Sequence, residues 1–210
     1  MNPRDLVAQS YDQMGHRYAD WASKIRTEER VRYTSVLLDR LLVGAQLLEL
    51  GCGPGIPTTK QLAQRFSVTG VDISIEQIKL ARKNVPKARF ICADMCQLNF
   101  PPASFDAVAA FYSIIHVPRE EHASLLKSIA TWLRPGGLLV ATMGVGPGER
   151  DVTEDWMGFG IPMYWSNFDA ATNRRLIETA GFHLISARQE TEDEGGVPVT
   201  FLWIVAQKPE

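Results

Sequence analysis

The sequence has few cysteines and no cysteine pair of the kind that metal centres use. Its three cysteines are Cys52, Cys92 and Cys96, none at Cys-x-x-Cys spacing and none with a histidine or carboxylate at ligand distance. We therefore expect neither a disulfide framework nor a metal site. Reduced, partly buried thiols are typical of a cytoplasmic protein, which is the location we expect.

The sequence also lacks an excess of charge and a long apolar run. Its 22 lysines and arginines stand against 24 aspartates and glutamates, a formal net charge of −2. No basic stripe suited to a phosphate backbone results, and charges alternate in sign over residues 24–32. No uncharged apolar stretch is long enough to cross a bilayer, and the first residues lack a signal-peptide core. We expect neither a nucleic-acid partner nor a membrane partner.

No repeat or low-complexity linker divides the chain, so one domain over residues 1–210 is expected. From residue 45 onward, strand-like runs alternate with helix-like segments. This alternation predicts an α/β fold, Rossmann-like and doubly wound, with a mostly parallel sheet. The last two predicted strands, 182–189 and 200–207, are joined by a loop too short for a helix and should pair antiparallel.

Residues 1–43 are predicted to form a helical cap in front of the sheet. Apolar residues recur at steps of four and three, which is the period of a helix face. The predicted face of the first helix is Val7, Tyr11, Met14, Tyr18, Trp21 and Ile25, and that of the second is Val31, Leu38, Leu41 and Leu42. The first helix either packs on the core or forms one wall of a ligand site.

Helix ends further along the chain carry local signals. Ser74 and Gln77 have the spacing of a capping box, which predicts a helix start at residue 74. Asp169 is the expected cap of a later helix, and Gly181 its terminator. Another helix is predicted over "PTTKQLAQRF", residues 57–66.

A glycine-rich turn, "LLELGCGPG" at residues 47–55, follows the first predicted strand. Such a turn can cradle a phosphate, bind a dinucleotide or only reverse the chain. Asp72 ends the second predicted strand and Asp94 follows the third. The carboxyl ends of parallel strands meet at one edge, where an acid about 20 residues past the glycines suits a ribose.

Two details distinguish this turn from a dinucleotide site. The dinucleotide pattern places its third glycine three residues after the second, but Gly55 follows Gly53 by two. Glu49, beside the turn, would repel a pyrophosphate. A nucleoside that carries an ammonium or sulfonium fits better.

The motifs "ELGCGPG", "VDIS", "CADM" and "LRPGG" resemble those of the class I S-adenosylmethionine-dependent methyltransferases, in that family's order. The nearest resemblance is to the small-molecule methyltransferase-like group. It implies S-adenosylmethionine as cofactor and S-adenosylhomocysteine as product. It further implies that Glu49 faces the methionine end, Asp72 holds the ribose hydroxyls and Asp94 accepts from the adenine amino group. The cofactor residues expected are Tyr11, Tyr18, Glu49, Gly51, Cys52, Gly53, Gly55, Asp72, Ile73, Gln77, Ala93, Asp94, Met95 and Phe111.

The methyl acceptor is expected to be a small, fairly apolar molecule. The fourth strand lacks the Asn/Asp-Pro-Pro-aromatic motif of family members that methylate DNA bases, and the chain has no Pro-Cys pair. Residues 144–168 form a long aromatic-rich segment that is either a substrate lid or part of the core. His116 is the candidate general base or, equally, a hydrogen-bonding turn residue. The substrate residues expected are Tyr112, Asp155, Trp156, Met163, Tyr164 and Trp165.

Two other functions stay open from the sequence. An NAD(P)-dependent oxidoreductase is opposed by Glu49 and by the glycine spacing. A non-catalytic module that binds S-adenosylmethionine is opposed by motifs that are all intact. The sequence leaves open whether the methylated atom is O, N, S or C.

Overall fold

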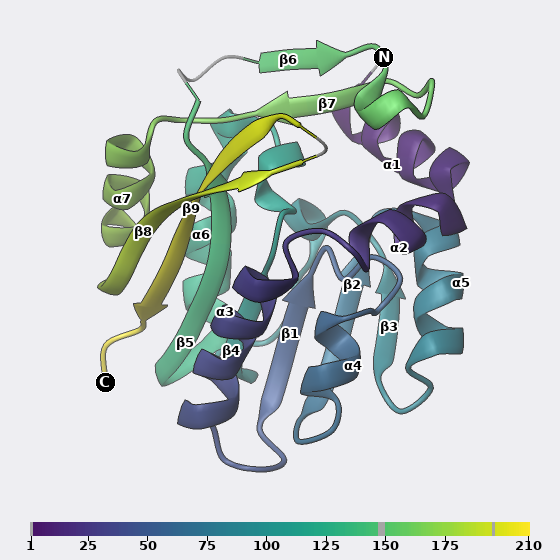
Figure 1. The fold of residues 1–210 in the computed structure, drawn as a ribbon. Coiled ribbons are helices and arrows are strands. Elements are labelled where there is room, and N and C mark those ends of the chain that lie inside the picture. The colour runs from purple at the N-terminus through teal and green to yellow at the C-terminus, as the bar shows by residue number, and fades with distance from the viewer. Residues whose placement is uncertain (1, 147–149, 195) are drawn as a thin grey trace.

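The computed structural model describes residues 2–146, 150–194 and 196–210, and a seven-stranded sheet runs through its centre (Figure 1). The strand order is β3-β2-β1-β4-β5-β9-β8; the first five are parallel, and β9 is antiparallel to β5 and β8. The predicted fold class and antiparallel pair are confirmed. The strands are β1 (Gln46–Leu50), β2 (Ser67–Asp72), β3 (Arg89–Cys92), β4 (Phe105–Ala110), β5 (Leu133–Gly144), β8 (His183–Asp193) and β9 (Pro198–Gln207).

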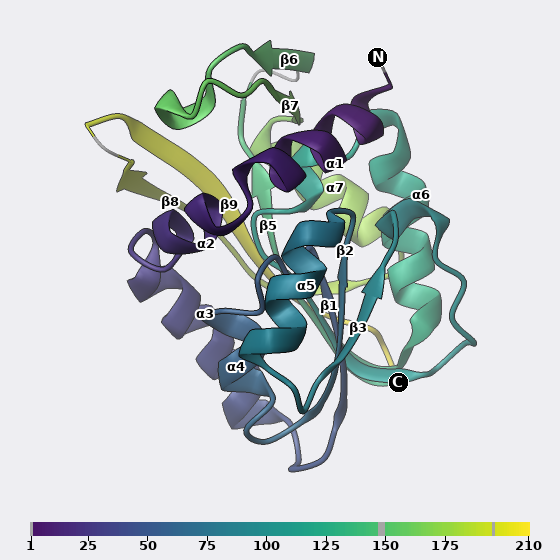
Figure 2. The same cartoon turned by 90° about the vertical axis from the view of Figure 1, so that its right-hand side faces the viewer.

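Helices cover both faces of the sheet, as the edge-on view in Figure 2 shows. One core lies under α3 and α4 and contains Leu37, Leu47 and Trp203; another lies under α6 and α7 and contains Leu126 and Ile177. No described helix combines the length and apolarity that crossing a membrane requires. The helices are α1 (Pro3–Met14), α2 (His16–Ala22), α3 (Thr27–Arg40), α4 (Thr58–Leu62), α5 (Ile75–Asn84), α6 (Arg119–Trp132) and α7 (Ala170–Thr179).

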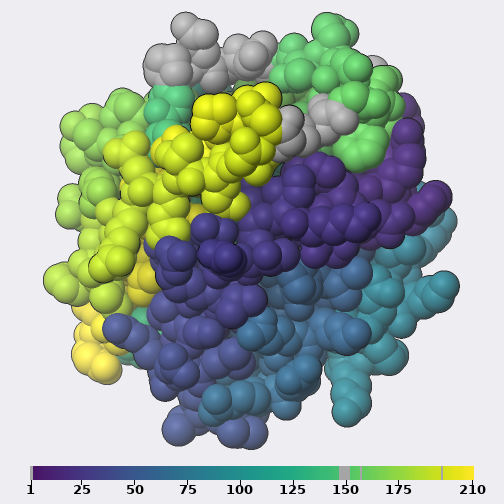
Figure 3. Space-filling view, viewed as in Figure 1, coloured from purple at the N-terminus to yellow at the C-terminus, as the bar shows by residue number. Residues whose placement is uncertain are grey.

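The carboxyl ends of the parallel strands point toward α1, α2 and a separate two-stranded ribbon (Figure 1). That ribbon pairs β6 (Arg150–Thr153) with β7 (Met163–Ser166) around the short helix η3 (Trp156–Gly158). In Figure 3 the N-terminal segment crosses the molecule below the ribbon and the β8–β9 hairpin. The strand-end edge, where ligands of such sheets bind, is therefore covered.

The predicted helix starts at Ser74 and Asp169 are confirmed, but the Gln77 side chain does not complete a capping box, because the Ser74 N–H donates to Asp72 instead. The Ser74 side chain accepts a hydrogen bond from the Gln77 backbone N–H at 3.1 Å and starts α5. Asp169 accepts from the Thr172 backbone N–H at 2.8 Å and starts α7, and Gly181 follows its end with φ of 97°. These ends depend on residues a few positions apart, so the sequence alone fixes them.

Three predicted elements differ in detail. The first helix is broken at Gly15, whose φ of 51° interrupts the helical path between α1 and α2. The helix after the glycine turn ends at Leu62, short of residue 66. The predicted lid 144–168 contains the β6–β7 ribbon; its residues 147–149 lie outside the described residues.

The buried face of α3 differs in part from the predicted one, although Leu38 and Leu41 pack against the core as expected. Tyr33, Thr34 and Leu37 are buried, whereas Val31 is 52% exposed and Leu42, past the end of the helix, is 85% exposed. Tyr33 stacks flat on Trp203 of β9, with ring centroids 4.1 Å apart. The aromatic partner on a distant strand sets this face, and the local apolar spacing does not show it.

We expect Leu37→Ala to lower the free energy of unfolding by about 2–5 kcal/mol, because it leaves a cavity under α3. Leu42→Ala should change it by less than about 0.5 kcal/mol, because that side chain is largely in water. Urea unfolding of both variants measures the difference. Equal losses of unfolding free energy in the two variants would contradict the burial of Leu37 and the exposure of Leu42.

Candidate functional site

A pocket opens at the carboxyl ends of β1, β2 and β4 and is roofed by α1 and α2. Most residues that the sequence predicts for the cofactor line it. They are Tyr11, Tyr18, Glu49, Gly51, Cys52, Gly53, Asp72, Ile73, Ala93, Asp94, Met95 and Phe111.

Asp72 organises one side of this pocket from the end of β2. One carboxylate oxygen accepts from the Gly53 N–H at 2.8 Å and the other from the Ser74 N–H at 2.9 Å. Burial raises the pKa of Asp72 to about 6, against the lowering effect of these two bonds. Each oxygen keeps a further lone pair, so the carboxylate can accept two ligand hydroxyls as well.

Glu49 and Arg30 border the pocket at the end of β1. Glu49 is 4% exposed and accepts from the Thr59 hydroxyl at 2.5 Å. Burial raises the pKa of Glu49 to about 7, while the Thr59 bond and the Arg30 charge lower it. A buried acid and a guanidinium at one end of a pocket suit a ligand that carries both an ammonium and a carboxylate.

The glycines of the turn have different neighbours. A Cβ on Gly51, whose φ is 71°, would lie 2.2 Å from the Ser113 Cβ, so this close approach requires glycine. Gly55 faces Ala81 and Val85 of α5 instead of the pocket. Gln77 also lies outside the pocket wall: it is buried and donates to the Tyr11 and Gly15 carbonyls, which ties α1 to α5. For Gly55 and Gln77 the geometry gives a packing role.

Asp94 lies at the opposite end of the pocket, after β3. It caps η1 (Met95–Gln97) by accepting from the Cys96 N–H at 2.9 Å. Its other oxygen lies 2.7 Å from Nε of Arg4 on α1, and Arg4 also pairs with Glu121 of α6. Arg4 therefore fastens the start of α1 to the sheet edge beside Asp94.

His116 ends the short helix η2 (Ile114–His116) and is hydrogen-bonded at both ring nitrogens. Nδ1 lies 2.9 Å from the Tyr164 carbonyl, which can only accept, so Nδ1 carries the proton. Nε2 is then the acceptor for the Tyr11 hydroxyl, 2.9 Å away. Burial lowers the pKa of His116 to about 4, so the ring is neutral at pH 7.

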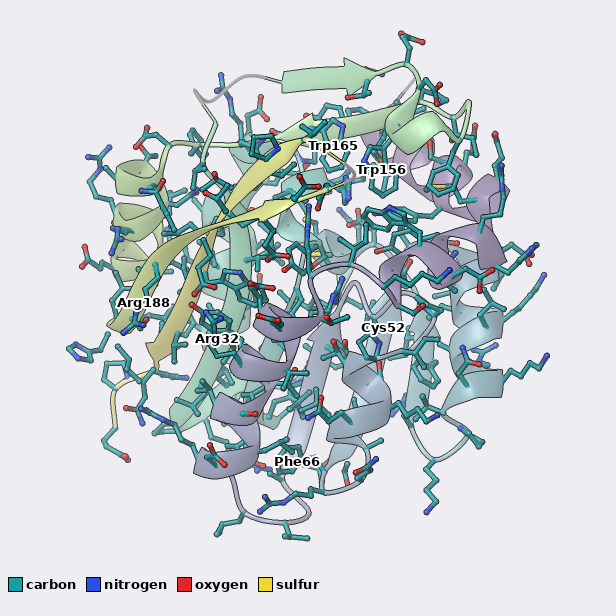
Figure 4. All side chains as sticks on the ribbon, viewed as in Figure 1. Arg32, Cys52, Phe66, Trp156, Trp165 and Arg188 are labelled. Carbon is teal, nitrogen blue, oxygen red and sulfur yellow. The ribbon has the colours of Figure 1, made fainter. Side chains whose placement is uncertain are left out.

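A second, narrower cavity adjoins the pocket, and we call it the aromatic chamber. It shares Tyr11, Tyr18, Ala22, Arg30, Tyr112 and His116 with the pocket. Trp156 and Trp165 lie together above it, 5.5 Å between ring centroids, on the side of the ribbon (Figure 4). Its walls are Tyr11, Tyr18, Trp21, Ala22, Ile25, Arg26, Arg30, Tyr112, Ile115, His116, Trp156 and Trp165.

A third cavity lies beyond the chamber between β5, the ribbon and the β8–β9 hairpin. We call it the apolar cavity; it shares Arg26, Ile115, Trp156 and Trp165 with the chamber. The three spaces therefore follow one another through common walls.

The predicted substrate residues fall into two groups. Tyr112, Trp156 and Trp165 line the chamber. Met163 and Tyr164 instead pack in a buried cluster with Val7, Tyr11 and Met14 of α1. Asp155 is exposed and accepts from the Gly160 N–H at 2.6 Å, which holds the turn after η3.

Sequence reasoning missed the three arginines at these cavities, Arg4, Arg26 and Arg30. They lie in helical segments whose mixed charges are typical of a solvated face, and no local pattern distinguishes them. Only the packing of α1–α3 over the strand ends places them inside. Within the described ranges, no group of histidines, cysteines and acids could hold a metal ion.

Glu49 generates a pH-dependence of stability. Its folded pKa of about 7 lies above the unfolded value of 4.5, so its ionisation destabilises the ligand-free fold increasingly between those pH values and constantly above pH 7. The stability advantage of Glu49→Gln over the wild type should grow by about 2–3 kcal/mol from pH 5 to pH 8. Urea unfolding of both proteins at each pH measures it, and a constant difference would show that Glu49 titrates normally.

Comparisons with known proteins agree with this geometry. A family model described as a methyltransferase domain matches residues 47–137. The 27-O-demethylrifamycin SV methyltransferase of Amycolatopsis mediterranei (strain S699) is 36% identical over 145 residues, 64% of this chain and 53% of that protein. Trans-aconitate 2-methyltransferase of Enterobacter sp. (strain 638) is 36% identical over 133 residues, 60% of this chain and 51% of that one. The chain spans about half the length of these curated relatives.

A solved structure shows the same fold over nearly the whole chain. It is the 1,6-didemethyltoxoflavin-N1-methyltransferase of Burkholderia thailandensis, with 1,6-didemethyltoxoflavin and S-adenosylhomocysteine bound. The TM-score is 0.72 at 20% identity, covering 99% of this chain and 87% of that chain. The glycine turn and the strand-end acids lie within residues 47–137, the part of the chain that matches a methyltransferase domain, and the fold around them is that of the solved methyltransferase.

Proposed function

We propose that the protein transfers a methyl group from S-adenosylmethionine to a small acceptor held in the aromatic chamber. The observation that carries the proposal is the shared wall between the pocket and the chamber. A donor in the first space and an acceptor in the second would meet beside Tyr11, Tyr18 and His116. Methyl transfer requires the acceptor atom to lie in line with the methyl group of the donor, and two adjoining cavities allow this.

The pocket residues fit the cofactor along its length. Asp72 would accept from the ribose hydroxyls, and Asp94 from the adenine amino group with Ile73 against the ring. Glu49 and Arg30 match the ammonium and carboxylate of the methionine end, as their opposite charges and common position favour. S-adenosylmethionine supplies a methyl group on a sulfonium.

The chamber supports transfer by positioning and by its aromatic faces. The Tyr11 and Tyr18 rings meet edge to face with their centroids 4.8 Å apart, and the centroids of the Trp21 and Trp156 rings lie 5.4 Å apart. Aromatic faces attract cations, and buried walls exclude water from the reacting atoms. Holding the two partners in line can account for about 7–11 kcal/mol of the barrier reduction.

His116 has a narrower role in this proposal than that of a free base. Nε2 is engaged by the Tyr11 hydroxyl, and a pKa of about 4 makes the ring a weak base at neutral pH. We therefore assign His116 to hold Tyr11 at the pocket–chamber boundary. General-base catalysis typically raises a reaction rate by about 10²–10⁴-fold, which is less than alignment of the two reactants can contribute.

Residues 150–168 act in the proposal as the cover of the chamber. Trp156 and Trp165 close it, whereas Met163 and Tyr164 anchor the cover on α1. Ser10 of α1 adds a hydrogen bond to the Pro162 carbonyl at 2.5 Å. The aromatic segment thus combines the two roles that the sequence left open, a substrate wall and part of the core.

The proposal is tested by measuring S-adenosylhomocysteine formation across phenols, amines, thiols, carboxylic acids and quinols. Product formation that requires both the protein and an acceptor supports it. Calorimetry with S-adenosylhomocysteine and with NADH, side by side, separates it from the oxidoreductase alternative. Binding of NADH alone would contradict the proposal, and binding of S-adenosylhomocysteine without turnover on any acceptor would leave a binding module.

Asp72→Asn should weaken S-adenosylhomocysteine binding about tenfold to 150-fold, because charge-assisted bonds to two hydroxyls are lost. Asp39→Asn, an exposed site on α3, removes the same charge and should leave affinity unchanged. Calorimetric titration of both variants measures the effect. Unchanged affinity in a folded Asp72→Asn protein would remove the ribose assignment.

Trp165→Ala should raise the acceptor KM or lower kcat, while the dissociation constant of S-adenosylhomocysteine stays within about threefold. The reason is that Trp165 borders the chamber and the apolar cavity but not the cofactor pocket. Steady-state kinetics with the best acceptor and calorimetry give the two constants. A loss confined to cofactor binding would contradict this division.

A further inference from the structure

Arg26 is held rigidly where the chamber meets the apolar cavity. It stands between α2 and α3 with a left-handed φ of 55°, an uncommon and strained conformation for a residue other than glycine. Its guanidinium lies 4.2 Å from the centroid of the Tyr112 ring and 4.1 Å from that of Phe201. The two rings are nearly perpendicular to each other, at 88°, and contact the guanidinium from adjacent sides, so its N–H groups remain available to a polar partner.

A carboxylate of this chain already occupies that edge. Glu194, from the turn of the β8–β9 hairpin, pairs with Arg26, and the two side chains are only 6% and 8% exposed. A buried ion pair carries a large desolvation cost and by itself is weak evidence for stability. Glu194 therefore shows which chemical group the position accepts, a carboxylate.

Further donors around Arg26 lack a partner. Nε of Arg26, Nε of Arg30 and the hydroxyl of Tyr112 are buried and make no hydrogen bond. Arg30 lies over the same Tyr112 ring, 4.5 Å from its centroid. An unpaired buried donor costs about 1–3 kcal/mol, so a set of them is best satisfied by an anionic ligand.

The two arginines border different spaces. Arg30 lines the cofactor pocket and the chamber, whereas Arg26 lines the chamber and the apolar cavity but not the cofactor pocket. The carboxylate of the methionine end can reach Arg30. Arg26 faces whatever occupies the acceptor side.

The wall beyond Arg26 is mostly apolar, and its polar members are Thr153, Asn167, Glu194 and Thr200. The apolar cavity is larger than the chamber, and its apolar side chains come from η2, β5, the ribbon and the hairpin. They are Ile115, Val145, Trp156, Trp165, Val197, Val199 and Phe201. An acceptor bound by its acidic group at Arg26 could place its apolar body here and another atom toward Tyr11.

We propose that the methyl acceptor is an apolar molecule bearing a carboxylate, and that Arg26 binds this carboxylate in exchange for Glu194. Calling this ligand a methyl acceptor rests on the proposed function. The carboxylate-binding site itself is argued only from the residues that line the cavities. Arg26 is then the specificity-determining residue of the acceptor side, and Arg30 its counterpart on the cofactor side.

The test uses 1-naphthoate and 1-naphthamide, which share shape and apolar area but differ in charge. Both are titrated, by quenching of tryptophan fluorescence and by calorimetry, into protein saturated with S-adenosylhomocysteine. Naphthoate should bind the wild type at least about tenfold more tightly than naphthamide, since a bond between charged groups exceeds a neutral one. Arg26→Gln should abolish this preference, and Arg30→Gln should keep it while weakening S-adenosylhomocysteine binding.

Glu194→Gln is the matched second variant. It removes the competing charge and leaves Arg26 in place, so naphthoate affinity should rise at least about threefold, whether or not Arg26→Gln folds. Equal binding of the two probes, binding of neither, a preference that survives in folded Arg26→Gln, or no gain in folded Glu194→Gln would overturn the inference.

The failures of the two proposals differ. Absence of S-adenosylhomocysteine formation with every acceptor removes the transferase proposal but leaves the naphthoate preference measurable. Turnover of neutral acceptors with no naphthoate preference removes the inference and leaves the transferase.

Discussion

The strand-end edge depends on one buried carboxylate, that of Asp72. It accepts from the backbone N–H groups of Gly53 and Ser74, and so joins the glycine turn to the start of α5. Because both bonds favour the ionised form while burial opposes it, the group is held at a pKa of about 6. The same oxygens that shape the pocket are those that we propose for the ribose hydroxyls. In our proposal, architecture and ligand recognition therefore rest on the same atoms.

The N-terminal helices convert this open edge into an enclosed site. Asp12 of α1 accepts from the Ser74 hydroxyl at 2.5 Å and the Glu76 N–H at 3.1 Å, at the start of α5. Tyr11, one residue earlier, reaches His116, whose other nitrogen bonds the ribbon at Tyr164. The roof of the cofactor pocket and the cover of the chamber are thus linked through two side chains. The hydrogen bonds Tyr11–His116 and His116–Tyr164 therefore connect the wall of the pocket directly to the ribbon that covers the chamber.

The sequence predicts those features that depend on neighbouring residues. The caps at Ser74 and Asp169, the strand alternation and the acids after β2 and β3 are all of this kind. The break at Gly15 and the exposed Leu42 escaped prediction because the helical period continues through them, and packing on distant strands decides the outcome. Arg26 and Arg30 escaped for a related reason: their roles arise only when α3, β4 and the β8–β9 hairpin meet around Tyr112. Long-range packing, rather than local pattern, builds the surroundings of Arg26 and Arg30.

A crystal structure of the protein with S-adenosylhomocysteine tests the central claim most directly, that donor and acceptor spaces meet through a shared wall. The account predicts the ribose at Asp72, the homocysteine ammonium and carboxylate at Glu49 and Arg30, and the sulfur directed toward the chamber beside Tyr11. A sulfur directed away from the chamber, or a ligand bound outside the strand-end pocket, would contradict it.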